Sequence, residues 1–195
     1  MHILLTRPLE DSHELIVKFR SLGHEVSHLP LISIKEKVHE KISFKDFNSI
    51  IFTSSNAIKF LDLKKIDKKI NCFCVGSATE KKAKNNGFQN VFAAEGNVNN
   101  LKELILQNLD SSDGKLIYVS GEIISTNLDQ ELISEGYNVK RIINYISNPI
   151  EKFNLDFVEK LKLKMPEIIY IYSQNSAVSF LNFIKNYGLV DLCMD

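Results

Sequence analysis

Two stretches of this chain place the same residue types in the same order, and their polar parts have the chemistry of anion binding. Residues 49–61 and 169–181 each contain an apolar run, a few small polar residues and an amphipathic stretch. Aligned one to one, Phe60 falls on Phe180. The pattern predicts a buried strand, a polar turn and a helix that begins on the turn. Because hydroxyls and the free N–H groups of a first helical turn suit anions, two copies predict two similar lobes, each with an anion-binding edge.

Three further apolar runs end in polar turns of the same kind. Ligands of open parallel α/β sheets bind beyond the carboxyl ends of the strands, so these turns are candidate substrate-binding positions. Short hydroxyls, amides and backbone N–H groups donate hydrogen bonds to carboxylate or phosphate oxygens. The same residue types are preferred helix N-caps, which is the alternative for each turn alone; the five turns together favour a binding edge. The candidates are Thr6, Arg7, Thr53, Ser54, Ser55, Asn56, Ser77, Thr79, Ser120, Gly121, Ser173 and Asn175.

Tyr145 is the titratable candidate among these strand ends. It closes the apolar run of residues 142–145, at the point where the chain is expected to cross between lobes. A phenol in this place can donate a proton or a hydrogen bond to a leaving group. Packing alone is the alternative role for this ring.

Other kinds of site lack support in the sequence. The five histidines all precede residue 40 and have no metal-ligand spacing, so no metal site is predicted. No GxxxxGK[ST] or GxGxxG motif occurs, so no nucleotide cofactor is predicted either. The cysteines Cys72, Cys74 and Cys193 form no CxxC pair. Cys72 and Cys74 alternate with Phe73 in an apolar run, which predicts two buried thiols on one face of a strand.

The overall composition is that of a globular protein without a dominant charge. The 195 residues include 24 basic and 24 acidic side chains, so no net field attracts nucleic acid. Lysines near residues 64–69 and 81–84 are expected on solvated helix faces, with nucleic-acid contact as the alternative. No apolar run approaches the roughly 20 residues that span a bilayer, and the start lacks the features of a signal peptide. We therefore expect a cytoplasmic protein that binds neither membranes nor nucleic acid.

Apolar runs alternate with amphipathic stretches along the chain, which predicts an α/β fold with parallel sheets covered on both faces. We expect a discontinuous first lobe of residues 1–34 and 150–195, incomplete at its carboxyl end. A second α/β lobe, residues 35–149, is inserted into it.

The chain crosses between the predicted lobes twice. Residues 25–34 are expected to form one strand interrupted by Pro30, and proline in a strand belongs at an edge or a crossing. Residues 30–35 and 143–149 are the two crossing segments. They are expected side by side, as a two-stranded linker.

In this order, the motifs resemble the uroporphyrinogen-III synthase family over essentially the whole chain. The motifs are Ile3-Leu4-Leu5-Thr6-Arg7-Pro8, Gly23-His24-Glu25-Val26 with Leu29-Pro30-Leu31-Ile32, Phe52-Thr53-Ser54-Ser55-Asn56-Ala57, Val75-Gly76-Ser77-Ala78-Thr79, Tyr145, and Ser173 with Asn175-Ser176-Ala177-Val178. The resemblance implies a cofactor-free enzyme of two α/β lobes with its active site in a cleft.

The resemblance also implies a reaction and roles for residues. Its substrate is hydroxymethylbilane, a linear tetrapyrrole with eight carboxylates, which loses water and closes to uroporphyrinogen III with inversion of the terminal ring through a spiro intermediate. Without an enzyme the substrate closes to the symmetrical isomer. Tyr145 would assist loss of the hydroxyl, and Thr79 and Ser173 would hold carboxylates or order the cleft. A monomer that receives its substrate from the preceding deaminase is also implied.

One departure from the family concerns the carboxyl end. The family continues with a further strand, a second glycine-threonine turn, a helix and a final strand and helix, which are expected beyond residue 195. We expect either a fragment or a shortened variant, with apolar surface exposed on residues 168–171. Reduced activity and stability of this form are expected.

Two other functions fit parts of the pattern. A sugar-phosphate-binding α/β module would use the hydroxyl-rich turns but leaves the crossing segments unexplained. A catalytically inactive two-lobe binding protein would retain the fold without turnover. Binding of a hexose phosphate tests the first alternative, and turnover of hydroxymethylbilane tests the second.

Overall fold

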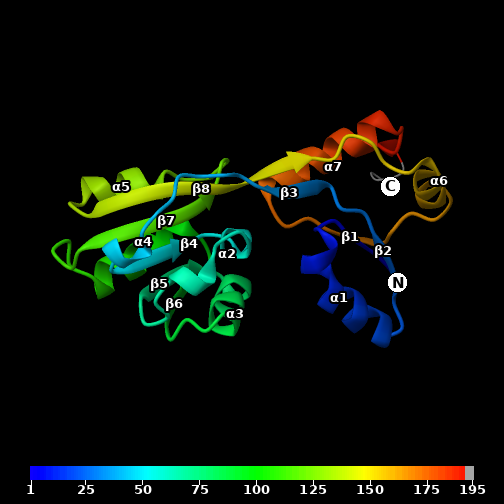
Figure 1. Cartoon of the computed structure of the whole chain (residues 1–195). Helices are drawn as coiled ribbons and strands as arrows, with labels where there is room; N and C mark the ends of the chain where they lie inside the picture. The colour runs from blue at the N-terminus through cyan, green and yellow to red at the C-terminus, as the bar shows by residue number, and fades with distance from the viewer. Residues whose placement is uncertain (192–195) are drawn as a thin grey trace. The chain divides into compact units, whose positions relative to one another are not determined.

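The computed structural model describes residues 1–191 and divides the chain into two compact units (Figure 1). Unit 1 consists of Met1–Ile34 and Ser147–Asp195, and unit 2 of Lys35–Ile146. Each unit has its own sheet with parallel strands and covering helices, so the α/β fold class is confirmed. Among the described residues, no helix is long and apolar enough to cross a membrane.

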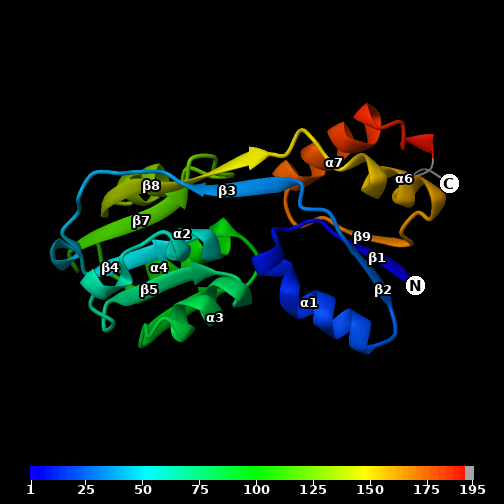
Figure 2. The ribbon, with the colours of Figure 1, turned by 45° about the vertical axis from the view of Figure 1, so that its right-hand side comes forward.

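Unit 1 contains a three-stranded parallel sheet in the order β2-β1-β9. Its elements are β1 (His2–Leu5), α1 (Leu9–Ser21), β2 (Glu25–His28), α6 (Leu155–Leu163), β9 (Ile168–Tyr170) and α7 (Gln174–Asn186). Ile3 and Leu5 face α1, whereas Leu4 faces the cluster of α6 and α7 that includes Val158 and Phe183. Helices therefore cover both faces of the sheet, as a parallel sheet requires (Figure 2).

Unit 2 is built on a six-stranded sheet in the order β3-β8-β7-β4-β5-β6. Its strands are β3 (Ile32–Glu36), β4 (Ser49–Phe52), β5 (Asn71–Val75), β6 (Asn90–Ala94), β7 (Lys115–Gly121) and β8 (Asn138–Pro149). Its helices are α2 (Ser55–Lys59), α3 (Ser77–Asn85), α4 (Val98–Asn108) and α5 (Leu128–Ser134), with 3₁₀ turns at Phe44–Asp46 and Leu63–Lys65. All pairings from β8 to β6 are parallel, so the carboxyl ends of these strands meet at one edge.

Successive residues of β5 pack into the hydrophobic cores on opposite faces of this sheet. Cys72 and Cys74 lie in the cluster under α2 and α3, and Phe73 lies in the opposite cluster under α4 and α5. Both thiols are fully buried, so the prediction of two cysteines on one apolar face is confirmed. Burial raises the pKa of the Cys74 thiol to about 11. Cys193 lies outside the described residues.

Two predicted elements differ from the structure. The single strand expected over residues 25–34 is two strands, β2 and β3, because Pro30 has no N–H for a ladder and lies in the irregular segment between them. The helix expected over residues 56–63 ends at Lys59, where the chain turns and buries Leu61 in the core.

The two predicted crossing segments lie side by side in the six-stranded sheet. The backbone N–H of Lys37 donates to the carbonyl of Asn144, and that of Ile150 to Leu31, each with an N···O distance of 2.9 Å. β3 and β8 therefore run in opposite directions, unlike the parallel strands beside them. Both chain crossings between the units fall within these two strands.

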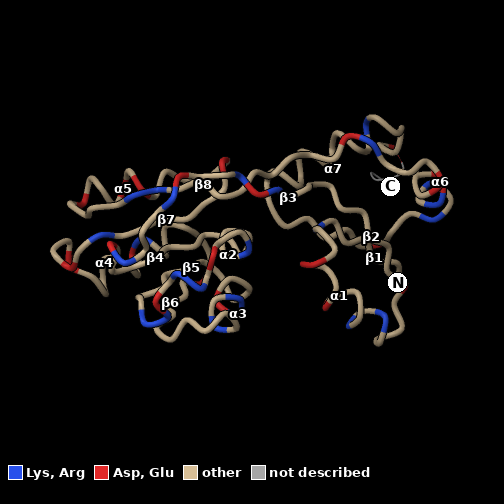
Figure 3. Tube along the Cα trace, in the orientation of Figure 1, with Lys and Arg blue, Asp and Glu red and all other residues tan. Residues whose placement is uncertain are grey.

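Lysine and arginine are interspersed with aspartate and glutamate along both units (Figure 3). Ion pairs such as Lys84 with Glu80 and Lys102 with Glu135 are exposed or half-exposed. This distribution agrees with the zero net charge and leaves recognition of a polyanion to local groups.

Candidate functional site

The carboxyl ends of β4 and β7 bring hydroxyl groups together in unit 2. Thr53 Oγ1 and the phenol oxygen of the buried Tyr118 are 3.0 Å apart, which joins the two strand ends. Ser54 is the N-cap of α2 and accepts a hydrogen bond from the Asn56 N–H at 3.2 Å. Thr53, Ser54, Ser120, Gly121 and Tyr145 form what we call the β4–β7 edge.

Tyr145 reaches this edge through an irregularity in β8. Along β7 and β8, Ser120 pairs with Ile143 but Gly121 pairs with Tyr145, so Asn144 is an extra residue. Such a bulge redirects the side chains around it. The Tyr145 ring packs against the core under α2 and lies over Gly121, where an added Cβ would come within 2.7 Å of ring carbons Cε2 and Cζ.

The environment of Tyr145 favours the neutral phenol. Burial raises the pKa of Tyr145, and hydrogen bonds to the Ser54 side chain and the Gly121 backbone oppose the shift. The pKa of Tyr118 is also raised by burial. Both phenols are therefore protonated at neutral pH and can act as hydrogen-bond donors.

Asn144 connects the bulge to α2. Its side chain is fully buried, and Nδ2 donates to the carbonyl of Ala57 at 2.7 Å. Its Oδ1 has no partner among the residues that the structure describes. This single bond ties β8 to the helix that Ser54 caps.

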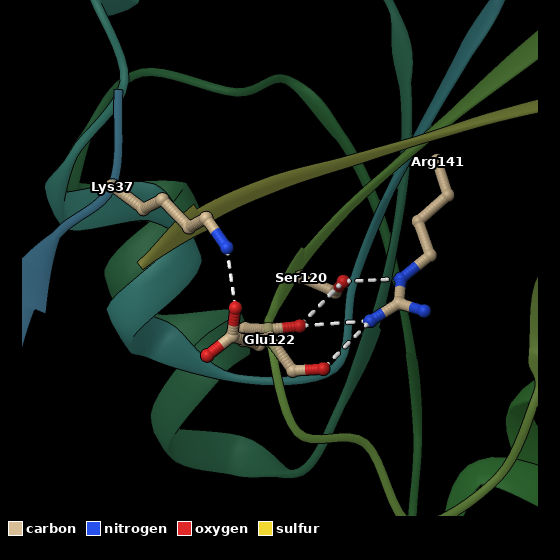
Figure 4. Close-up of polar contacts among 5 residues, drawn as sticks. Lys37, Ser120, Glu122 and Arg141 are labelled. Carbon is tan, nitrogen blue, oxygen red and sulfur yellow. Dashed lines mark hydrogen bonds and ion pairs between the residues drawn. The ribbon is translucent and has the colours of Figure 1, made fainter. Parts of the chain in front are cut away.

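Arg141 holds the end of β7 from the neighbouring strand (Figure 4). Its Nε donates to Ser120 Oγ at 2.8 Å, and Nη2 donates to the carbonyls of Gly121 at 2.9 Å and Glu122 at 3.2 Å. The Glu122 carboxylate also forms an ion pair with Lys37.

The predicted turn after β5 begins at Gly76, whose φ of +77° favours glycine. Ser77 is exposed in the first turn of α3, whereas Thr79 is only 4% exposed. The structure therefore presents the Ser77 hydroxyl to solvent and places Thr79 inside the packing beneath the turn.

The edge of unit 1 places a guanidinium over an aromatic ring. Thr6 is buried, and its Oγ1 donates to the carbonyl of Tyr170 at 2.6 Å, linking β1 to β9. The next residue, Arg7, lies with Cζ 4.0 Å from the centre of the Tyr172 ring. This cation–π contact orients the guanidinium of Arg7. The Tyr172 hydroxyl is buried and unpartnered within the described part of the chain.

Ser173 is the N-cap of α7 at this edge. It caps α7 by accepting the Ser176 N–H at 3.2 Å, and its hydroxyl lies 2.9 Å from that of Ser176. Asn175 is exposed in the first turn. The edge of unit 1 thus combines Arg7, Tyr172, Ser173 and Asn175.

The structure places the predicted residues in three groups. Thr53, Ser54, Ser55, Asn56, Ser120, Gly121 and Tyr145 gather at the ends of β4 and β7 and at the bulge of β8; Ser77 and Thr79 follow β5; Thr6, Arg7, Ser173 and Asn175 belong to unit 1. The expectation that Tyr145 ends its strand is wrong, because β8 continues past it to Pro149 and pairs with β3. Within residues 1–191, no group of three or more His, Cys, Asp and Glu side chains could hold a metal ion.

Sequence reasoning missed Tyr118, Arg141, Asn144 and Tyr172 as parts of these edges. Arg141 left one signal, because a half-buried charged residue directly before the apolar run of residues 142–145 needs a specific partner. The partners of Tyr118 and Asn144 depend on strand order and on the bulge, which residue spacing does not reveal.

These features define the class of protein: two α/β units, one inserted into the other, with hydroxyl-rich turns at the strand ends. The sequence pattern described as Uroporphyrinogen-III synthase HemD matches residues 13–194. The chain belongs to the uroporphyrinogen-III synthase family. Its activity is accordingly the cyclisation of hydroxymethylbilane to uroporphyrinogen III, a step of tetrapyrrole and heme biosynthesis.

Comparison with a solved structure supports this fold. The uroporphyrinogen-III synthetase from Helicobacter pylori 26695 is similar with a TM-score of 0.61 and 19% identity, over 93% of this chain and 78% of that one. A mutant uroporphyrinogen III synthase from the extremely thermophilic bacterium Thermus thermophilus matches with a TM-score of 0.49 and 13% identity, over 95% and 77% of the two chains. No curated protein is similar enough to the chain to count as a match.

Proposed function

We propose that Tyr145 assists loss of the substrate hydroxyl and that the strand-end turns hold the carboxylates of hydroxymethylbilane. The observation that carries this proposal is the neutral Tyr145 phenol, laid over Gly121 beside the hydroxyl of Ser54. It combines a proton donor with hydrogen-bond donors for an anion at one edge of a sheet.

Tyr145 acts in this proposal as a general acid. The phenol gives its proton to the hydroxymethyl oxygen while the carbon–oxygen bond breaks, and water leaves. The pyrrole nitrogen lone pair stabilises the resulting cation, and the carbon framework then closes with inversion of the terminal ring. In the spiro intermediate a new bond has formed to the substituted α-carbon of the terminal ring, and the older bond of that carbon to the chain then breaks. The hydrogen-bearing α-carbon of the same ring forms the closing bond and loses its proton, which returns to the phenolate.

The carboxylate-binding groups divide by exposure into two kinds. Exposed or half-buried groups contact the acetate and propionate arms directly: Arg7, Thr53, Ser54, Ser55, Asn56, Ser77, Ser173 and Asn175. Thr6, Thr79 and Ser120 are buried and order the turns from beneath, and Gly121 provides the flat backbone surface under Tyr145.

Positioning supplies most of the catalysis in this proposal. The free substrate closes without inversion, so the protein must favour one folded geometry over another. Holding reacting groups in place can contribute on the order of 7–11 kcal/mol in favourable cases. This accounts for edges rich in hydroxyls and poor in acid–base pairs.

The proposal extends to the surroundings of the reaction. The protein works in the cytoplasm as a monomer and takes hydroxymethylbilane from the preceding deaminase, without nucleic acid or membrane partners. Spontaneous closure of the free substrate supports a short transfer path. Size-exclusion chromatography with light scattering, alone and with the deaminase, tests the monomer and the hand-over.

The test of the activity is an isomer assay on the 195-residue chain. Hydroxymethylbilane is generated in situ, the protein is added, and the products are oxidised and separated as porphyrin isomers. Mainly isomer III is expected. Isomer I alone, at the rate of the protein-free control, contradicts the proposal.

A further inference from the structure

We propose that Arg141 is a positioning residue for Tyr145: its guanidinium fixes the last residues of β7, and these fix the place of the phenol. The proposal rests on the role proposed above for Tyr145. Arg141 itself contacts neither the phenol hydroxyl nor the substrate in this scheme.

The first step of the argument is the geometry of the guanidinium. Two of its nitrogens reach three acceptors on consecutive residues, namely Ser120 Oγ and the carbonyls of Gly121 and Glu122, at 2.8, 2.9 and 3.2 Å. The Ser120 hydroxyl donates its own hydrogen to the Gly121 carbonyl at 3.0 Å. A planar fork with several fixed donors suits this task, whereas a lysine ammonium does not reproduce it.

The second step is that Tyr145 binds the same three-residue segment from the same strand. The Glu122 N–H donates to the Tyr145 carbonyl at 3.0 Å, and Gly121 pairs with Tyr145 across the bulge. Residues 120–122 thus accept hydrogen bonds from the Arg141 side chain of β8 and donate one, from the Glu122 N–H, to the Tyr145 carbonyl of the same strand. A shift of the segment moves the surface on which the phenol lies.

The third step is the tightness of the contact between Gly121 and the ring. A Cβ on Gly121 would lie 2.7 Å from Tyr145 Cζ and 2.9 Å from its hydroxyl oxygen, so a side chain there would require the ring to shift. The ring and the glycine backbone are therefore in direct contact, and displacement of one displaces the other.

Other contacts of the segment are weaker constraints. Lys37 and Glu122 form an ion pair, but their side chains are 40% and 51% exposed, and exposed pairs contribute little. Asn144 fixes the opposite side of the bulge through Ala57. Arg141 is thus the main group that fixes the β7 side.

The kinetic test uses Arg141→Lys, with Arg20→Lys as the matched control. Arg20 also donates to a backbone carbonyl, that of Val26, but in unit 1. Arg141→Lys is expected to lower kcat about 10- to 100-fold with KM unchanged, since small misplacements of reacting groups have effects of this size. Arg20→Lys is expected to leave both constants unchanged.

A double-mutant cycle shows whether Arg141 acts through the phenol. In a Tyr145→Phe background, Arg141→Lys is expected to have no further effect on kcat, because the proton donor that it positions is gone. Losses that multiply in the double variant would overturn the proposal.

A spectroscopic readout works without turnover. The chain contains six tyrosines, and with tyrosine labelled by ¹³C at Cζ, the signal of Tyr145 is the one missing from Tyr145→Phe. Arg141→Lys is expected to move this signal and that of Tyr118, whose ring centre lies 5.9 Å from Arg141 Cζ. The signals of Tyr170 and Tyr187 in unit 1 are expected to stay in place.

A second variant keeps the test decisive if Arg141→Lys does not fold. Gly121→Ala leaves Arg141 in place but pushes the ring, so it is expected to move the same Tyr145 signal and to lower kcat. An unmoved Tyr145 signal in a folded Arg141→Lys protein would refute positioning. A protein that yields only isomer I would instead refute the proposed function and leave the spectroscopic result to decide this inference.

Discussion

Tyr145 illustrates how partial burial keeps a weak acid protonated. The phenol is removed from water by the core under α2, and this burial raises its pKa above the ordinary value for tyrosine. It consequently stays protonated throughout the physiological pH range. A carboxylic acid in the same place would need a much larger shift to remain neutral.

The substitution Tyr145→Phe keeps the ring and removes the proton donor. We expect kcat to fall about 10²- to 10⁴-fold, the usual range for loss of a general acid, with an unchanged unfolding midpoint. The isomer assay, stopped at a series of times, measures kcat, and thermal unfolding measures the midpoint. Tyr137→Phe is the control, because Tyr137 donates to Leu109 in the core of the same unit. Unchanged kinetics for Tyr145→Phe would leave the ring a packing role only.

Two substitutions of Thr79 distinguish a role of its hydroxyl from a role in packing. It is 4% exposed, so Thr79→Val retains its volume and removes the hydroxyl, whereas Thr79→Ser retains the hydroxyl. We expect Thr79→Val to disturb the turn that Thr79 orders from beneath and so to raise KM several-fold, and Thr79→Ser to stay near the wild type. Equal KM values for Thr79→Val and the wild type would argue against any contribution to binding.

The candidate residues could be found from sequence only where a pattern is local. Thr53, Ser54 and Ser173 each follow an apolar run and open a helix, a pattern that lies within a dozen residues. The contacts of Arg141 depend on β7 and β8 being neighbours in register, and the contact of Tyr118 with Thr53 depends on β4 and β7 being neighbours. Register between distant strands depends on the packing of the whole sheet, so spacing along the chain does not encode it directly.

The strand–turn–helix unit occurs twice, with different helix lengths. α2 has five residues and α7 has thirteen, although both begin at a serine that caps the first turn. The shorter helix ends because the chain must bury Leu61 soon after it. The longer one buries Phe180, Phe183 and Ile184 along one face.

The cap of α7 is expected to serve both stability and binding. Ser173→Ala removes the acceptor for the Ser176 N–H and should lower the free energy of unfolding by about 1 kcal/mol and raise KM. Asn154→Ala removes the cap of α6 and should have the same effect on stability but none on KM. Urea unfolding and steady-state kinetics of both variants provide the comparison. Equal KM values in the two variants would assign Ser173 to capping alone.

Element types were more predictable than element ends. Alternating apolar runs and amphipathic stretches identified the order of strands and helices, since each pattern reflects one buried face. Pro30 marked the crossing correctly, but the break into β2 and β3 was missed because apolar residues continue on both sides of the proline. The same residues satisfy the pattern of one strand or of two.

At the scale of the molecule, buried groups that ionise at high pH link stability to pH. Burial raises the pKa values of Cys72, Cys74, Tyr118 and Tyr145 in the folded chain. Their contribution is fully present below the pKa values of the unfolded chain, about 9 for thiols and 10 for phenols. It is lost as pH rises further, because the unfolded state releases these protons first.

We therefore expect the free energy of unfolding to fall steadily above about pH 9. Urea unfolding at a series of pH values from about 7 to about 11 measures this slope. The double substitution Cys72→Ala and Cys74→Ala should flatten the first part of the decline, at the cost of some stability at neutral pH. The same decline in the double variant would show that other groups cause it.

The two-unit organisation was accessible from sequence because the strand–turn–helix pattern restarts within the chain. The structure changes units after residues 34 and 146, compared with predicted changes after residues 34 and 149. The return falls inside β8, a continuous strand, so no turn or composition change marks it. The strand leaves one core and enters the other without a break, so the boundary depends on how the two cores pack.

The bulge in β8 has a consequence for which lengths of this strand are tolerated. A regular strand points neighbouring side chains to opposite faces, but the extra residue lets Asn144 and Tyr145 both lie toward α2. Deletion of Asn144 would restore the regular alternation and leave the tyrosine on that face. The hydrogen bond from Asn144 to Ala57 would be lost. Gain of one codon would separate the pair. We infer that insertions and deletions at this point of the strand disturb the place of Tyr145 more than a change of length in a loop would.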